Sequence, residues 1–167
     1  MAKKSIFAEI AKDTKRAREM AARRAAKKAL TSVIRYIRQY YAIRAKDLRE
    51  AYRVRYEFTG TTVKVSIVAY EKKPFPLIKY ASPKQTKKGV KVTVRKGARE
   101  LREHAFIATM PSGHKGIFLR KTKKSLPIRE MYSASPRQLL SMTGATEHVQ
   151  KVFFDEFEKE HDRLLGL

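Results

Sequence analysis

The first 59 residues contain neither glycine nor proline, and this absence constrains the fold more than any other feature of the chain. Apolar side chains recur there at spacings of three and four, from Ile6 and Phe7 to Ile37 and Tyr41. The middle of the segment, MAARRAAKKAL, is rich in strong helix formers. The pattern predicts one helix over residues 5–41, which at about 1.5 Å per residue would be roughly 55 Å long.

A helix of that length exceeds what one domain of 167 residues needs to cover its own core. Its alanines leave a narrow apolar strip, and basic side chains surround that strip. Two interpretations stay open: a solvated helix, or an arm that packs on a neighbouring subunit. The basic side chains of this helix are Arg16, Arg18, Arg23, Arg24, Lys27 and Lys28.

The next hundred residues change to the period-two pattern of half-buried antiparallel strands. A short helix is predicted first, from Asp47 through Leu48, Ala51 and Tyr52, because Asp47 and Glu50 have the spacing of a capping box. The segment SPKQTKKG is predicted to be a mobile basic loop. Strands are predicted over residues 61–70, 90–97, 104–110, 116–121 and 126–132, with a short edge strand over 77–80.

The end of the chain predicts two helices. Ser135 suits an N-cap, Pro136 the first helical position and Gly144 a helix stop. The last helix is amphipathic, with Val149, Phe153, Phe157 and Leu164 on one face. The fold class is therefore α+β: a long N-terminal helix and a short helix, an antiparallel sheet of four to six strands, and two C-terminal helices. We expect a single domain over residues 1–167, with a projecting basic helix (1–44), an α+β core (45–134) and C-terminal helices (135–167).

Charge is the strongest compositional signal, since 39 basic and 16 acidic residues give a net charge of +23. The excess extends over most of the chain and reverses only in residues 145–167, where acidic residues outnumber basic ones by six to three. Polyanions should bind such a surface, and an acidic tail could meet the basic body of a neighbour. No apolar run is long enough to span a membrane, no secretory signal is visible, and there are no cysteines.

No pattern indicates an enzyme, a metal site or a cofactor. Ser112 and His114 lie two residues apart in the stretch HAFIATMPSGHKGIFLRK, but a serine nucleophile also needs an oriented base and an oxyanion hole. A Pro-Ser-Gly loop between strands is what a hairpin turn requires, so the turn is the favoured interpretation. The four histidines lack metal-ligand spacing, and there is no glycine-rich phosphate loop.

One block of the chain resembles a known family. The run from "AFIA" (105–108) through "GIFLR" (116–120) to "LPIREMYSASPRQLL" (126–140) is similar to the minor tail protein Z family of tailed phages and prophages, which is related to tail-completion proteins. A basic N-terminal helix, a short helix and a "PLIKY"-like strand (76–80) extend the likeness over most of the chain. The family has no catalytic motif to transfer.

The resemblance implies a structural protein of the virion that completes the tail at the head–tail junction, in the neck or at the top of the tail tube. It implies a homo-oligomeric ring, for which six-fold symmetry is one candidate. The neighbours would be tail-tube, tail-terminator or head-connector proteins, with DNA in the lumen as a further candidate contact. The protein would be found in the virion, and in the host cytoplasm during assembly.

The alternative function is non-specific nucleic-acid binding through the basic surface, with affinity that falls steeply with salt. In either case we expect the N-terminal helix and the 84–99 loop to face DNA or an acidic neighbouring protein. The candidate contact residues are Arg16, Arg23, Arg24, Lys27, Lys28, Lys84, Lys87, Lys88, Arg120, Lys121, Lys123 and Lys124.

Overall fold

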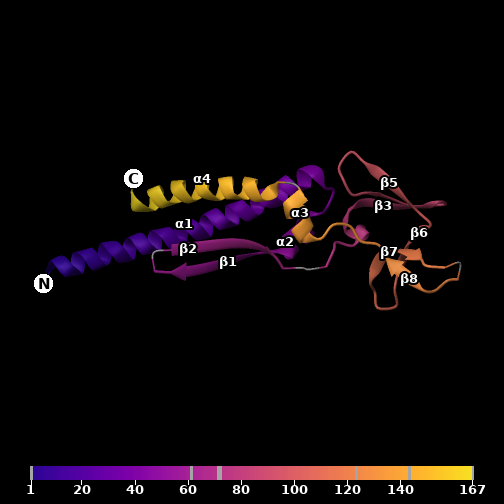
Figure 1. Ribbon diagram of the computed structural model, residues 1–167, viewed down its shortest axis with the longest axis horizontal. Coiled ribbons are helices and arrows are strands. Elements are labelled where there is room, and N and C mark those ends of the chain that lie inside the picture. The colour runs from indigo at the N-terminus through magenta and orange to yellow at the C-terminus, as the bar shows by residue number, and fades with distance from the viewer. Residues whose placement is uncertain (1, 61, 71–72, 123, 143, 167) are drawn as a thin grey trace.

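The predicted long helix is α1, Ala2–Tyr40, in a computed structural model that describes residues 2–60, 62–70, 73–122, 124–142 and 144–166. It occupies one half of an elongated molecule, and the strands after residue 77 lie at the opposite end (Figure 1). The sequence prediction of this helix is confirmed, with ends that differ by three residues or fewer.

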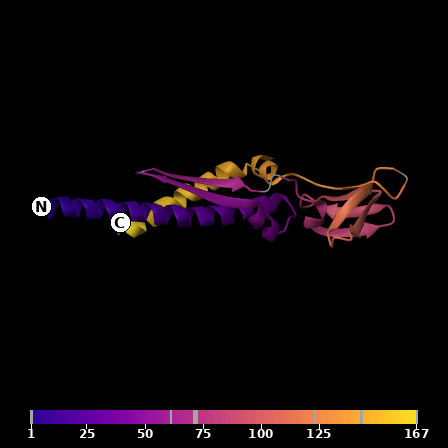
Figure 2. The same cartoon turned by 90° about the horizontal axis from the view of Figure 1, so that it is seen from below.

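Two elements of the same chain cover the middle of α1. The C-terminal helix α4, Ala145–Leu165, lies along one side, and the hairpin of β1, Tyr52–Thr59, and β2, Thr62–Ala69, lies along another (Figures 1 and 2). The predicted alanine strip is therefore buried within the chain, with every member at most 6% exposed. Its members are Ala17, Ala21, Ala22, Ala25, Ala26 and Ala29.

The short helix α2, Ala45–Ala51, begins two residues before Asp47. The prediction that Asp47 caps this helix was wrong, because its carboxylate binds cations instead. Its Oδ2 accepts a hydrogen bond from Arg44 Nε at 2.7 Å, and its Oδ1 lies 3.4 Å from Lys79 Nζ. Asp47 is only 5% exposed, so this pairing compensates a buried charge.

The α+β class is confirmed, but the single sheet of four to six strands was wrong. The described residues form eight strands in three separate antiparallel sheets. β1 and β2 make the first sheet, in full register from Tyr52↔Ala69 to Thr59↔Thr62. The second contains β3, Ala81–Thr86, β4, Gly89–Thr93, and β5, Arg99–Glu103. The third contains β6, Ala105–Thr109, β7, Lys115–Arg120, and β8, Ile128–Glu130.

Local chain geometry separates the three sheets. Pro74 and Pro76 lie between β2 and β3, where the missing N–H groups prevent a continuous ladder. His104 turns the chain between β5 and β6 with a left-handed φ of +58°. The prediction of an edge strand over residues 77–80 was also wrong, because the chain makes a tight helical turn there. Residues Leu77–Lys79 form the 3-10 helix η1, in which Lys79 N donates to Pro76 O at 3.0 Å.

The segment predicted as a mobile basic loop is ordered, because it forms β3 and the turn into β4. Thr86 pairs with Gly89, which leaves Lys87 and Lys88 as a two-residue hairpin turn. Gly89 has a φ of +150°, and a Cβ there would lie 2.1 Å from the backbone oxygen of Arg102. Only glycine therefore allows β4 to start so close to β5.

The predicted start of the C-terminal region is confirmed. Helix α3 is Pro136–Met142, and Ser135 and Gln138 form a reciprocal capping box before it. Ser135 N donates to Gln138 Oε1 at 2.9 Å, and Gln138 N donates to Ser135 Oγ at 3.3 Å. Gly144 separates α3 from α4 with a left-handed φ of +64°, and α4 begins at the next residue.

The helical half and the sheet half share one hydrophobic core. The chain after α1 joins the second sheet through Ala42, whose N–H donates to Val94 O at 2.9 Å and whose carbonyl accepts from Ala81 N at 2.7 Å. The buried side chains run from α1 through α2 and η1 to β4 and β7. They include Val33, Ile37, Leu48, Tyr52, Phe75, Leu77, Val90, Val92, Ile117 and Leu139.

Candidate polyanion-binding site

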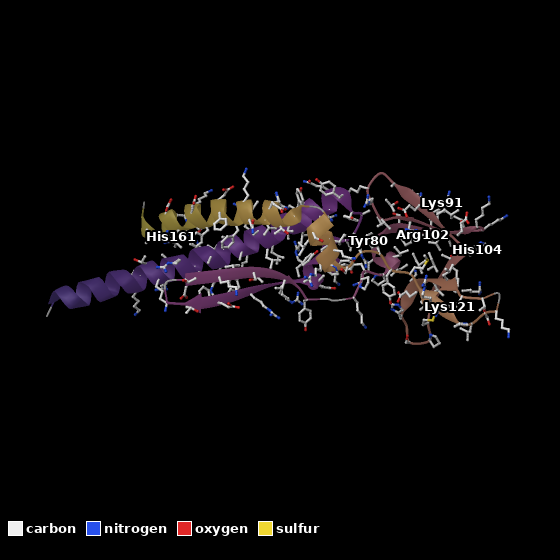
Figure 3. All side chains as sticks on the ribbon, viewed as in Figure 1. Tyr80, Lys91, Arg102, His104, Lys121 and His161 are labelled. Atoms are coloured by element: carbon white, nitrogen blue, oxygen red, sulfur yellow. The ribbon has the colours of Figure 1, made fainter. Side chains whose placement is uncertain are left out.

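A hollow of about 900 Å³ lies at the sheet end of the molecule, between the β3–β4 turn and the end of β7. Figure 3 shows two of its lining residues, His104 and Lys121, at the end far from the N terminus. The lining brings together two basic segments that lie about 30 residues apart in the sequence. It consists of Gln85, Lys87, Lys88, Gly89, Glu103, His104, Ala105, Phe106, Leu119, Arg120, Lys121 and Thr122.

Two backbone features hold the β3–β4 turn over the hollow. The hairpin turn at Lys87 and Lys88 depends on Gly89, as described above. The corner residue His104 then ties this turn to the start of β6, since its backbone N–H donates to Lys88 O at 3.0 Å. The position of the two lysines is therefore fixed by backbone contacts, while their side chains stay exposed.

Gln85 links the second and third sheets beneath the hollow. Its Oε1 accepts a hydrogen bond from Ile107 N, on β6, at 2.8 Å. Its Nε2 lies 3.3 Å from the carbonyl oxygen of Gly89 and 3.4 Å from that of Ala105, so the amide touches both sheets. This side chain thus bridges the β3–β4 turn and the strand that carries Phe106, in addition to the backbone bond of His104.

The charge in the hollow is strongly positive. Lys87, Lys88, Arg120 and Lys121 are all exposed, and Glu103 is the one acidic residue among the described lining residues. Among the described residues none of these four cations makes an ion pair. The guanidinium of Arg120 lies 4.7 Å from the ring centroid of Phe106, which restrains the guanidinium by a cation–π contact.

This arrangement fits a phosphate-bearing ligand. Lysine ammonium groups and an arginine guanidinium are the usual partners of phosphate oxygens. The hollow is open and has no group poised for covalent chemistry among its described lining residues. It can therefore hold an anionic backbone, and the affinity should fall as salt rises.

The remaining candidate contact residues do not join this surface. On α1, Arg24 Nη1 lies 2.7 Å from Glu160 Oε2, and Lys28 pairs with Glu156, both on α4. The guanidinium of Arg23 lies 5.0 Å from the ring centroid of Phe58 on β1. The acidic C-terminal helix therefore meets the basic N-terminal helix of its own chain.

The other predicted residues are exposed at separate places. Arg16 and Lys27 lie on α1, Lys84 on β3, and Lys124 in the connection between β7 and β8. Lys123 lies outside the described residues. The eleven described candidates thus divide between α1 and the sheet end, and of these eleven only Lys87, Lys88, Arg120 and Lys121 line one hollow.

Ser112 and His114 lie in a hairpin turn, as predicted. Met110 N donates to His114 O at 2.8 Å, and Gly113 N donates to Met110 O at 2.8 Å with a φ of +81° at the glycine. Among the described residues, Ser112 makes no hydrogen bond to His114.

The partner of His114 is a carboxylate on the neighbouring strand. His114 Nε2 lies 2.9 Å from Glu130 Oε1, and Tyr132 Oη donates to Glu130 Oε2 at 2.6 Å. That hydrogen bond raises the pKa of the Tyr132 hydroxyl. A second hollow of about 410 Å³ adjoins this group. Among the described residues, no cluster of histidine and carboxylate side chains could hold a metal ion.

Sequence reasoning missed Gln85, His104 and Phe106 as parts of the hollow. The turn residues Lys87 and Lys88 are not one of the dipeptides, such as Asn-Gly or Asp-Gly, that signal a two-residue hairpin, so no sequence pattern placed Gln85 on a strand. No sequence pattern gives the contact between Gln85 and Ile107, which are 22 residues apart.

Comparison with known protein families, characterised proteins and solved structures gives no significant match for this chain. Among the described helices, none has the length and apolar character that crossing a bilayer requires. A functional proposal for this chain therefore depends on its geometry and its sequence motifs.

Proposed function

We propose that this protein is a structural virion subunit that completes the tail of a phage or prophage at the head–tail junction. It acts by assembling into a ring and by docking to neighbouring neck and tail proteins. The support is the motif order over residues 105–140, which resembles the minor tail protein Z family, together with the unusually large surface of the isolated chain.

The exposed surface is the observation that supports an assembly subunit best. The chain exposes 11711 Å², whereas a compact monomer of its mass would expose about 8,500 Å². Two standard protein interfaces bury about 1,600 Å² on the subunit that they flank. The excess of roughly 3,000 Å² is therefore large enough for a subunit that contacts a neighbour on each side of a ring.

The positive charge of the sheet end favours a position in which it faces DNA in the ring lumen or an acidic neighbouring protein. Acidic residues of α4 already neutralise Arg24 and Lys28 within the chain. The cations of the hollow have no such partner among the described residues, so they remain available to a polyanion. A ring around a DNA passage would gain from these charges on its inner surface.

Electron microscopy of nuclease-treated full-length protein tests the proposal, together with mass measurement by light scattering. We expect rings, or binding to tail ends, that persist in about 0.5 M salt, because protein interfaces depend less on counterion release than DNA contacts do. A protein that stays monomeric at every concentration and binds no phage structural component would contradict the proposal.

The hollow supports a second candidate function, non-specific nucleic-acid binding. Its four cations predict that alanine at all four positions lowers the slope of log affinity against log salt by about 4 for duplex DNA. Fluorescence anisotropy with two unrelated DNA sequences measures this slope. A matched control replaces four exposed cations elsewhere, and equal losses in both variants would contradict a site at the hollow. The control positions are Lys46, Arg49, Arg55 and Lys64.

A further inference from the structure

We infer that the N-terminal arm of α1, residues 2–16, docks on the exposed acidic stripe of α4 in a second copy of the chain. The stripe consists of Glu147, Lys151, Phe154, Asp155, Glu158, Asp162 and Leu165. This inference rests on the proposed ring assembly and names the surfaces that would join one subunit to the next.

The arm extends beyond every element that covers α1. Helices α1 and α4 are antiparallel, with Ser32 beside His148 and Arg24 beside Glu160. In that register the end of α4 is level with about residue 19 of α1. Figures 1 and 2 both show α1 continuing past α4 and past the β1–β2 hairpin. Residues 2–16 would extend roughly 22 Å at about 1.5 Å per residue.

A helical arm of this length is a poor candidate for a permanently solvated element. Isolated helices of about 15 residues are marginal in water, and most gain their stability from packing an apolar face. In the sequence, Ile6, Phe7 and Ile10 recur at helical spacing. Lys12 and Arg16 are exposed in the structure, four residues apart.

The stripe on α4 has the matching chemistry. It lies opposite the face that packs on α1, because its members are exposed while Val149, Phe153 and Phe157 are half-buried. Phe154 is 60% exposed and Leu165 is 39% exposed, so the stripe offers apolar area between its charges. The full stripe has four carboxylates and one lysine.

The three carboxylates in the C-terminal part of the stripe are available to a partner. Among the described residues, Asp155, Glu158 and Asp162 make no ion pair. No described side chain of the same copy therefore pairs with them, and a basic helix from outside would do so.

The chain already contains a template for this contact. Within one copy, Arg24 and Lys28 pair with Glu160 and Glu156, so two cations four residues apart meet two carboxylates four residues apart on an antiparallel helix. Lys12 and Arg16 repeat the first spacing. Glu158 and Asp162 repeat the second, on the opposite face of α4.

A second copy is the occupant that this geometry requires. The arm continues past the end of its own α4 (Figure 1), and the stripe residues are exposed on the face of α4 opposite α1, so one chain cannot bring the two together. The arm and the stripe are different surfaces, which makes the contact heterologous. Repetition of a heterologous contact closes into a ring when the rotation between copies allows it.

A charge-swap experiment on the full-length, nuclease-treated protein tests the docking. The arm variant is Lys12→Glu with Arg16→Glu, and the stripe variant is Glu158→Lys with Asp162→Lys. We expect each variant to raise the concentration of half-assembly by at least about tenfold in light scattering. The four substitutions together should restore assembly to within about threefold of the wild type, because opposite charges again face each other.

Matched controls separate this contact from a change in net charge or in folding. Arg49→Glu with Arg55→Glu and Glu50→Lys with Glu57→Lys alter the net charge equally at exposed positions outside the arm and the stripe. Circular dichroism must give the wild-type helix content for each variant. Wild-type assembly of the arm and stripe variants, or failure of the combined variant to recover, would overturn the docking while the ring proposal stands. A wild-type protein that is always monomeric would overturn both.

Discussion

Gln85→Ala removes a side chain that hydrogen-bonds to both the second and the third sheet beneath the hollow. In the wild type, Gln85 Oε1 accepts from Ile107 N at 2.8 Å, and Nε2 is shared among the carbonyl oxygens of Thr86, Gly89 and Ala105 at 3.1, 3.3 and 3.4 Å. We expect the variant to fold but to hold the two sheets less firmly.

The expected loss of stability follows from these distances. The short bond to Ile107 contributes about 1 kcal/mol, and the longer, shared bonds of Nε2 together contribute at most about 1 kcal/mol more. Gln85 is exposed, so water can replace part of what is lost. A loss of about 1–2 kcal/mol in a chain of this length lowers Tm by about 2–8 °C.

Thermal unfolding and amide hydrogen exchange together measure the effect. The backbone amide of Ile107 should exchange faster in Gln85→Ala, since it loses its acceptor. Gln85→Glu is a matched comparison because it keeps acceptor oxygens but loses the donor, so protection of Ile107 should remain. Lys84→Ala, at the exposed neighbouring position, should leave both measurements unchanged. A Gln85→Ala protein with Tm within about 1 °C of the wild type and an equally protected Ile107 amide would refute the assignment.

Three further predictions concern single positions. Gly89→Ala should cost more than about 3 kcal/mol in denaturant unfolding because a Cβ would overlap the backbone of β5, whereas Gly97→Ala, with φ +82° and open space, should cost about 1 kcal/mol. Tyr52→Phe should cost about 1 kcal/mol, because the buried hydroxyl donates to a backbone oxygen at 2.8 Å. Burial also raises the pKa of the Tyr52 hydroxyl, so the protonated hydroxyl stabilises the fold fully below the pKa of an unfolded tyrosine, about 10, and this contribution is lost as the pH rises further. The free energy of unfolding should therefore decline less steeply above about pH 10 in Tyr52→Phe than in the wild type. Ser112→Ala and His114→Ala should leave particle formation unaltered in electron microscopy, and a large loss from either with folding intact would indicate a catalytic role.

The helices could be predicted from the sequence because their signals are local. Apolar side chains at spacings of three and four, with no glycine or proline between them, indicate α1, and Ser135 with Pro136 indicates the start of α3. β1 was missed although Tyr52, Val54 and Tyr56 alternate with arginine and glutamate, because the capping-box pattern at Asp47 extended the expected helix through residue 52. The strand pattern was present in the sequence, but the capping-box pattern at Asp47 favoured a helix over the same residues. In the structure Asp47 does not cap the helix, because its carboxylate pairs with Arg44 and Lys79.

The candidate site could be predicted only in part. The basic segments around Lys87 and around Arg120 could be identified from the sequence, because counting charges does not require a structure. The meeting of Lys88 with Arg120 in one hollow depends on the corner at His104 and on Gln85, which join residues far apart in sequence. The same limit applies to Arg24 and Glu160, which are 136 residues apart. Opposite charges predict that these helices attract each other, but not whether they belong to one chain or two.

The pairing of the first helix with the last also determines how the chain folds during synthesis. About a hundred residues separate the end of α1 from the start of α4, so a ribosome adding roughly 5–20 residues per second leaves α1 without its helical partner for roughly 5–20 s. Alanine is well suited to this interval, because its small side chain exposes little apolar area to chaperones or to other nascent chains. Leucines at these buried positions would overpack the contact with α4 and would expose more apolar area until α4 is made.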